Sequence, residues 1–272
     1  MKRLFDLNWH GNNKVGKDTS CVSTVKNLFS YSPINLFTYR KSAFTLAEIL
    51  ITLAIIGVVA AITMPTLIQN HQKRSLEVAT QKFYSMMSQA VKQYMADEGV
   101  DDLRNTALTE SDDNDADAYP YWTGFMNKYF KIIDICDTER YCFAKRYKVF
   151  NENSYVENVM SGRYAYILTN GMIIGVLPPD NAVPATITVD VNGEKGPNRF
   201  GYDLWSMSLF YDGTLDASYV TPECKQNNIC PFGYSNPSEI RQDRYEVYCI
   251  SGSENYGGCF GHFLENGFKF DY

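Results

Sequence analysis

Residues 44–68 read FTLAEILITLAIIGVVAAITMPTLI, and this stretch sets the architecture of the whole chain. Its 25 residues contain one charged side chain, Glu48. As an α-helix with a rise of about 1.5 Å per residue, the stretch would be about 37 Å long, and the hydrocarbon core of a bilayer is about 30 Å thick. We therefore predict a transmembrane helix over residues 44–68.

The segment before this helix is basic. Residues 1–43 carry seven Lys and Arg against two Asp, a net charge of +5, and they show no apolar periodicity. Lys and Arg next to a membrane helix favour the cytoplasmic side of the membrane. We therefore expect the part of the chain after the helix to lie on the opposite side. We interpret residues 1–43 as a cleaved leader that takes no part in the fold.

The remainder is acidic. The whole chain has a net charge of −6, so residues 44–272 carry −11 once the leader is removed. A protein with this balance lacks the broad basic face that nucleic-acid binding requires. We therefore expect no direct nucleic-acid partner.

The helical pattern continues past the apolar stretch and becomes amphipathic. Apolar side chains recur at helical spacing on one face, namely Leu76, Ala79, Phe83, Met86, Met87, Ala90 and Tyr94. We predict one helix over residues 45–98, with residues 44–68 in lipid, residues 69–98 packed on a protein core, and Gly99 as its stop.

Residues 99–272 are predicted to form a globular head of the α+β class. Its first part, residues 101–118, is an acidic loop, and residues 119–130 favour a short helix. Strand patterns punctuated by Asn-Gly and Asp-Gly turns occur over residues 164–169, 172–177, 185–191, 204–211 and 245–250. We expect an antiparallel meander of three to five strands, whose apolar face the amphipathic half of the long helix would cover.

Six of the seven cysteines lie beyond residue 135, and the seventh, Cys21, lies in the leader. An even number beyond the membrane indicates disulfides, and free thiols are the alternative. Six cysteines allow 15 connectivities, and sequence does not choose among them. Their order suggests the neighbour pairs Cys136 with Cys142, Cys224 with Cys230, and Cys249 with Cys259.

The start of the apolar stretch carries a motif. Residues 40–48 read RKSAFTLAE, and residues 49–61 follow without a charge. This pattern resembles the processing signal of type IV prepilins and pseudopilins. The resemblance implies that a prepilin peptidase cuts between Ala43 and Phe44 and that Phe44 is then N-methylated. The family usually has Gly immediately before the cut, where this chain has Ala43.

The same resemblance implies that residues 44–68 also serve as a filament-core helix, and it assigns roles within that helix. A carboxylate in hydrocarbon is costly, by about 2 to 3 kcal/mol at full depth, so Glu48 needs a partner. In the family the matching glutamate attracts the amino terminus of a neighbouring subunit, which here is Phe44 of another copy. The family places helix-loosening residues where this chain has Gly57 and Pro65; alternatively, these two are ordinary membrane-helix residues.

A second, weaker resemblance lies in the head. Residues 190–203 read DVNGEKGPNRFGYD, which is similar to a DxNGxxGPNxxGxD loop in the heads of some pseudopilins. Oxygen ligands two residues apart suit calcium, so Asp190, Asn192 and Asp203 are candidate ligands. The alternative is a plain Asn-Gly turn that needs no ion, and we expect no required cofactor.

Catalysis has little support, because only three histidines occur and no hydrolase, metalloprotease or phosphate-loop motif is present. The resemblance implies a pilin-like fold and a non-enzymatic filament subunit of a type II secretion system or type IV pilus. Its expected partners are other pilin-like subunits, prepilin peptidase and the inner membrane, with the head outside the cytoplasm. The alternatives are a minor pilin with an adhesive head, a membrane-anchored extracytoplasmic enzyme, and a secreted protein cut near residues 59–61.

Overall fold

The computed structural model describes residues 43–109, 119–137, 139–150, 154–160, 163–177, 183–250 and 257–272. The predicted leader up to residue 42 and residues 110–118 of the predicted acidic loop lie outside the described residues. The chain divides into two compact units, residues 1–53 and residues 54–272. The second unit contains all of the strands described below.

Helix α1 (Leu46–Glu98) begins one residue after the predicted start and ends at the predicted residue. Gly99 follows it with φ +69°, a left-handed conformation that glycine adopts without strain. The apolar face predicted from residue 76 onward is confirmed, and Phe83, Met87 and Val91 are fully buried. Each such side chain stabilises the fold by about 1.5 to 3 kcal/mol through burial.

Within the described residues, six strands form one antiparallel sheet in the order β1-β4-β5-β6-β7-β8. Their bounds are β1 (Ile132–Cys136), β4 (Ala165–Leu168), β5 (Ile173–Leu177), β6 (Ala185–Asp190), β7 (Leu204–Leu209) and β8 (Leu215–Asp216). Two short strands, β2 (Arg146–Lys148) and β3 (Tyr155–Glu157), form a separate antiparallel pair. The predicted α+β class and meander are confirmed, and the sheet exceeds the predicted three to five strands.

The turns of the sheet follow the sequence signals. Asn170-Gly171 joins β4 to β5, with Gly171 at φ +85°. Gly213 closes the turn between β7 and β8 at φ +75°, and a Cβ there would lie 2.6 Å from the sulfur of Met95. This turn therefore packs directly against α1, and only glycine fits.

The predicted strand over residues 245–250 is wrong. These residues form a single π-helical segment, Tyr245–Ile250, that continues helix α4 (Pro237–Arg244). The alternation of apolar and polar residues suggested a strand, but the buried side chains are Tyr245 and Cys249, four residues apart, and Val247 is exposed. A disulfide from Cys249 holds that helical face inward.

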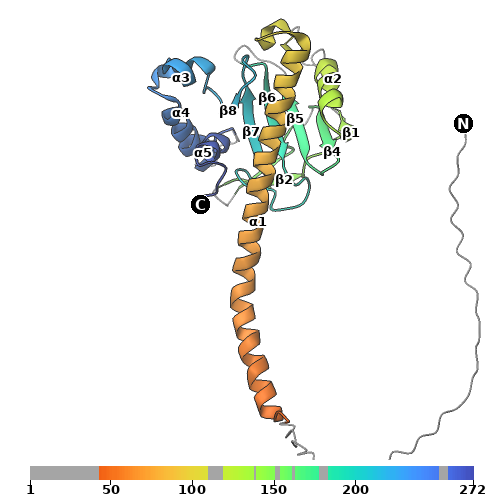
Figure 1. Cartoon of the computed structure of the whole chain (residues 1–272), viewed down its shortest axis with the longest axis vertical. Coiled ribbons are helices and arrows are strands. Elements are labelled where there is room, and N and C mark those ends of the chain that lie inside the picture. The colour runs from red at the N-terminus through yellow and green to blue at the C-terminus, as the bar shows by residue number, and fades with distance from the viewer. Residues whose placement is uncertain are drawn as a thin grey trace, which may run out of the picture. The chain divides into compact units, whose positions relative to one another are not determined.

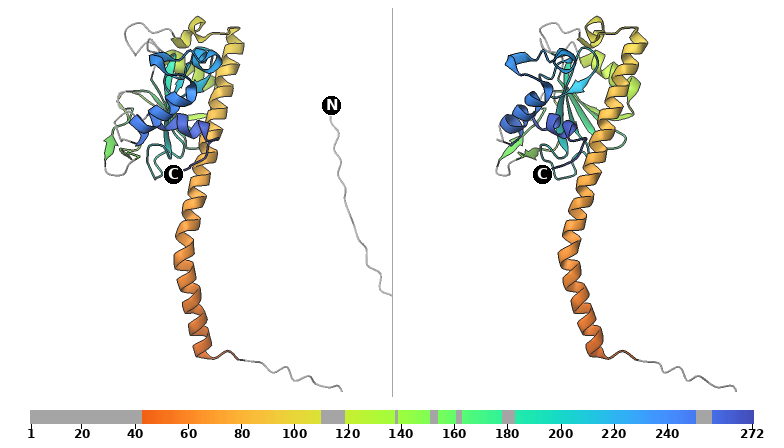
Figure 2. Two further views of the ribbon diagram at one scale, coloured as in Figure 1. Left: turned by 90° about the vertical axis from the view of Figure 1, so that its left-hand side faces the viewer. Right: turned by 60° about the vertical axis from the view of Figure 1, so that its left-hand side comes forward.

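The sheet is flanked by short helices. Helix α2 (Tyr119–Tyr129) confirms the predicted helix and lies near β1 and β4, whereas α3 (Pro222–Asn227), α4 and α5 (Cys259–Glu265) gather at the β7–β8 side (Figure 1). From residue 54 onward, α1 runs along one side of this unit, as the two turned views show (Figure 2). Its buried face and the sheet share one apolar core.

Three hydrogen bonds tie residues 269–272 to α1. The buried carboxylate of Glu77 accepts hydrogen bonds from Lys269 Nζ at 2.8 Å and from the backbone N–H of Phe270 at 2.9 Å. One turn earlier, Lys73 Nζ donates to the backbone oxygen of Tyr272. Residues 269–272, which we call the terminal strap, are thereby fixed to the helix.

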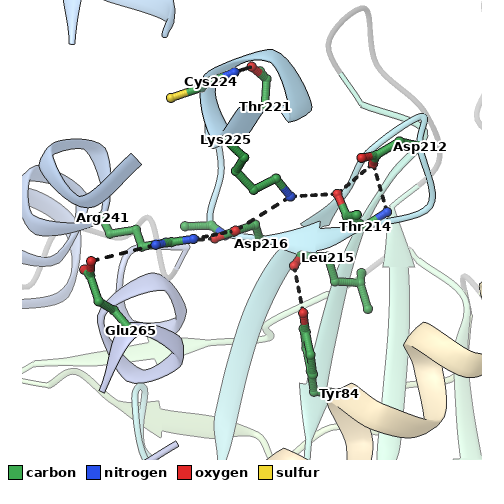
Figure 3. Close-up of polar contacts among 11 residues, drawn as sticks. Tyr84, Asp212, Thr214, Leu215, Asp216, Thr221, Cys224, Lys225, Arg241 and Glu265 are labelled. Carbon is green, nitrogen blue, oxygen red and sulfur yellow. Dashed lines mark hydrogen bonds and ion pairs between the residues drawn. The ribbon is translucent and has the colours of Figure 1, made fainter. Parts of the chain in front are cut away.

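An ion-pair network around the buried Asp216 joins the sheet edge to the short helices (Figure 3). The carboxylate of Asp216, at the end of β8, accepts from the Arg241 guanidinium of α4 at 2.7 and 3.1 Å. Arg241 also lies 3.8 Å from Glu265 of α5, and Lys225 of α3 lies 3.8 Å from Asp216. Nearby, the Tyr84 hydroxyl of α1 donates to the backbone oxygen of Leu215 at 3.5 Å.

Candidate functional site

The first part of α1 has an exposed apolar surface. From Phe44 to Gln72 every side chain is exposed except that of Ala60, which is half-buried. Among the described residues one helix, α1, is long and apolar enough to cross a membrane, and none of its apolar window is buried. An apolar helix surface of this size is stable only in lipid or against other apolar helices.

The amino-terminal end of α1 is capped by its own side chains. Thr45 donates from its backbone N–H and from its hydroxyl to Glu48 Oε2, at 2.8 and 2.9 Å. The Thr45 hydroxyl oxygen in turn accepts from the Glu48 backbone N–H at 3.2 Å. This is a reciprocal capping box, which satisfies backbone donors that a helix start otherwise leaves free.

The other predicted assembly residues lie on the same exposed helix. A Cβ added at Gly57 would meet no atom within 4 Å, so the subunit itself does not require glycine there. Pro65 lies inside the helix, where its missing N–H leaves one carbonyl without its helical donor. The predicted cleavage residues, Ala43 and Phe44, are both exposed and precede the first turn.

The loop of residues 190–203 brings two of its three candidate ligands into a buried network. Asp190 and Asp203 are fully buried, and Asn192 is half-buried. Asp190 accepts from the Tyr147 hydroxyl at 2.5 Å and from the Asn192 backbone N–H at 3.1 Å. Asp203 accepts from the backbone N–H groups of Asn198 and Arg199, at 2.7 and 2.6 Å.

Burial shifts the protonation of both carboxyls. Desolvation, together with the nearby charge of Asp203, raises the pKa of Asp190 to about 8. Desolvation also raises the pKa of Asp203 to about 6, although hydrogen bonds from backbone N–H groups, that of Arg199 first, oppose the shift. The side-chain oxygens of Asn192 and Asn198 are buried without a hydrogen-bond partner. Among the described residues, no group of three or more His, Cys, Asp or Glu side chains could hold a metal ion.

The described part of the chain contains three disulfides, and they join the neighbours in sequence order. The pairs are Cys136 with Cys142, Cys224 with Cys230, and Cys249 with Cys259. Each closes a short loop, of six residues in the first two cases and ten in the third. Such local bridges brace the loops of the head rather than linking distant elements.

Sequence reasoning missed two residues of these sites. The first is Thr45, which the sequence analysis assigns only to the processing motif. Its spacing from Glu48, Thr-x-x-Glu ahead of an apolar run, is the signature of a capping box. Tyr147 carried no signal, because its contact with Asp190 joins residues 43 positions apart. The sequence pattern alone cannot bring such residues together.

Comparison with known families matches two adjoining parts of the chain. Residues 38–64 match the family described as "Prokaryotic N-terminal methylation motif". The motif and the long apolar helix identify the chain as a type IV pilin-like protein, anchored in a membrane by α1 and carrying a soluble head.

Residues 66–172, which include the second half of α1 and the first strands, match the family described as "Family of unknown function (DUF6613)". Neither a curated protein nor a solved structure matches the chain. The class of the protein therefore rests on its amino-terminal segment and its architecture.

Proposed function

We propose that this protein is a structural subunit of a type II secretion or type IV pilus-like filament and that it acts through assembly rather than catalysis. The observation that carries the proposal is the exposed apolar surface of α1 directly behind a methylation motif. A helix with this surface is stable in a bilayer before assembly and against the helices of other subunits afterwards. The apolar surface of α1 that contacts lipid before assembly would then contact the helices of other subunits in the filament.

In this proposal Glu48 sets the position of each subunit relative to its neighbour in the filament. Within the subunit its carboxylate accepts two hydrogen bonds from Thr45, so it has hydrogen-bond partners before the subunit enters a filament. The methylated amino terminus of a neighbouring copy, at Phe44, is the positive partner that the carboxylate would meet in the filament. A pair of opposite charges removed from water is favourable only when both members are present.

The proposed partners are prepilin peptidase, which would cut between Ala43 and Phe44, and other pilin-like subunits. The basic residues before α1 favour a cytoplasmic leader and a head on the opposite side of the inner membrane. Three disulfides in the described head agree with an oxidising compartment. On this reading the head is incorporated into a periplasmic or surface filament.

Mass spectrometry of the mature amino terminus, from cells with the cognate peptidase, tests the proposal. The expected mature chain begins with N-methylated Phe44. Ala43→Leu is expected to retain the leader, whereas Ala43→Gly restores the residue usual in the family and serves as the matched control. A chain starting near Ile62 would identify an ordinary secreted protein, and an uncut leader would identify a static anchor.

An exposed aromatic patch favours a second candidate function, a minor pilin with a ligand-binding head. Phe232 is 77% exposed and Ile229 is 68% exposed, beside the Cys224–Cys230 disulfide. Tyr219 lies edge-on to Phe232 at 5.0 Å, and both have positive φ, which costs about 1 to 3 kcal/mol per residue. Phe232→Ala should then abolish adhesion without loss of filaments, and Tyr155→Ala, at another exposed aromatic, should not.

A further inference from the structure

A basic hollow lies where α1 leaves its apolar segment. The hollow has a volume of about 730 Å³ and lies between α1 and the terminal strap. Its lining combines basic and apolar side chains with a single acid, and consists of Leu67, Asn70, His71, Lys73, Arg74, Glu77, Lys269 and Phe270. Three basic side chains and one acid therefore line the hollow, and Lys73 Nζ also donates to the backbone oxygen of Tyr272.

This concentration of positive charge contrasts with the rest of the protein. Residues 44–272 carry a net charge of −11, and no Asp, Glu, Lys or Arg occurs between Glu48 and Lys73. The acid of the hollow, Glu77, is already engaged by Lys269 and by the Phe270 backbone. Lys269 nevertheless keeps a side chain that is 66% exposed.

Arg74 has the most available charge of the group. Its side chain is exposed, and no ion pair joins it to an acid among the described residues. A guanidinium presents several N–H donors in a planar fork, which matches the oxygens of a phosphate group. An anion entering the hollow would meet Arg74 and Lys269 from two segments that are almost 200 positions apart in sequence.

The depth of the hollow suits a lipid headgroup. The apolar stretch of α1 ends at Ile68, and Arg74 follows six residues later, about 9 Å along the helix. The polar headgroup layer extends about 5 to 8 Å beyond the hydrocarbon on each side of a bilayer. Long basic side chains also reach back toward that layer. The exposed Leu67 and the half-buried Phe270 lie on the same lining, as expected at a boundary between acyl chains and headgroups.

We propose that Lys73, Arg74 and Lys269 form a binding site for the phosphate headgroups of anionic membrane lipids. The site is built by the fold, because Lys269 reaches it only through the terminal strap. It would hold the base of the head on the membrane surface. The proposal needs only the membrane anchor and stands apart from the proposed filament function.

Native mass spectrometry of the full chain in detergent, titrated with phosphatidylglycerol or phosphatidylcholine, tests the site. The intact protein is expected to prefer phosphatidylglycerol. Arg74→Gln should weaken phosphatidylglycerol binding about fivefold, since a basic residue near an anionic surface contributes about 1 kcal/mol. Arg74→Gln with Lys269→Gln should weaken it further, and phosphatidylcholine binding should not change.

Lys82→Gln with Lys92→Gln is the matched control, because both lysines are exposed on α1 and lie farther from the apolar segment. Equal loss in this control would overturn the proposal, as would an equal affinity for the two lipids. Inorganic phosphate that competes at the same concentration as phosphatidylglycerol would identify a free-anion site instead. A loss of cross-linked dimers on Arg74→Gln, with unchanged lipid preference, would assign the hollow to a second copy. Thermal melting checks that each variant is folded.

Discussion

Glu48 and Thr45 cap each other across the first turn of α1. Two hydrogen bonds run from Thr45 to the Glu48 carboxylate, and one returns to the Thr45 hydroxyl. The carboxylate that the proposed filament needs is therefore already bonded within its own subunit. Pairing with a neighbour has to compete with this cap, which is worth about 1 kcal/mol.

Glu48→Gln should stop assembly and leave the head folded. The amide still accepts a hydrogen bond from Thr45, but it has no charge with which to attract an amino terminus. We expect intersubunit cross-linking in membranes to fall by at least tenfold, while the melting temperature of the head stays within about 1 °C. Thr45→Ser keeps the hydroxyl and is the control. Normal cross-linking by Glu48→Gln would show that assembly does not depend on an ion pair between Glu48 and the amino terminus of a neighbouring copy.

Asp190 should make the stability of the head depend on pH. Its ordinary pKa is 3.8, and burial raises it to about 8 in the folded head. Between these values the unfolded chain loses its proton while the folded chain keeps it, so the stability contribution of this residue falls as pH rises from about 4 to 8. Relative to Asp190→Asn, the native chain should therefore lose stability across that window.

Denaturant melts of both chains at a series of pH values measure this difference, and Asp101→Asn, at an exposed acid, controls for the loss of a charge. Parallel profiles for the native chain and Asp190→Asn would show that the carboxyl titrates as in the unfolded chain. The same melts at pH 8 with added calcium address the predicted ion. Stabilisation of the native chain but not of Asp190→Asn would support a calcium site at Asp190, Asn192 and Asp203.

Asp216→Asn should destabilise the head substantially. Asp216 is almost fully buried and receives two hydrogen bonds from Arg241, whose side chain is 15% exposed. Removing one member of a buried pair leaves the other charge uncompensated, at a cost of about 3 to 5 kcal/mol. Asp102→Asn, at an exposed ion pair, should cost less than about 1 kcal/mol. Chemical denaturation distinguishes the two, and equal small losses would contradict the role of the network.

Replacing Cys249 and Cys259 by Ser should lower the free energy of unfolding by about 2 to 3 kcal/mol. The disulfide closes a loop of ten residues, and the cost follows from the added freedom of the unfolded chain. It also holds the π-helical segment against the core, so we expect proteolysis to begin near residues 245–259. Reduction of the native chain also opens the other two disulfides, so it should cost at least as much. An unchanged melting curve for the Cys249→Ser, Cys259→Ser variant would show that packing alone fixes this segment.

Much of the fold was predictable because its signals are local. A run of 25 residues with one charge, an amphipathic face at helical spacing, and Asn-Gly turns each depend on neighbouring residues. Helix α1, helix α2 and strands β4 to β7 are confirmed for this reason. Strand β8 is only two residues long, and residues 245–250 alternate like a strand while a disulfide and helix α4 hold them helical.

The candidate sites divide in the same way. The processing motif is contiguous, and the family comparison at residues 38–64 covers it. The buried network at Asp190 depends on Tyr147, and the basic hollow depends on Lys269, both distant in sequence from their partners. Contacts of this kind come from the folded chain and from no pattern of neighbouring residues.

The terminal strap also has a mechanical consequence. Glu77 and Lys73 hold residues 269–272 against α1 within ten residues of its apolar segment. A pull along α1 would therefore act on residues 269–272 directly, through these hydrogen bonds. The same pull would reach the sheet through the apolar core that α1 and the sheet share, so the head would move together with its helix.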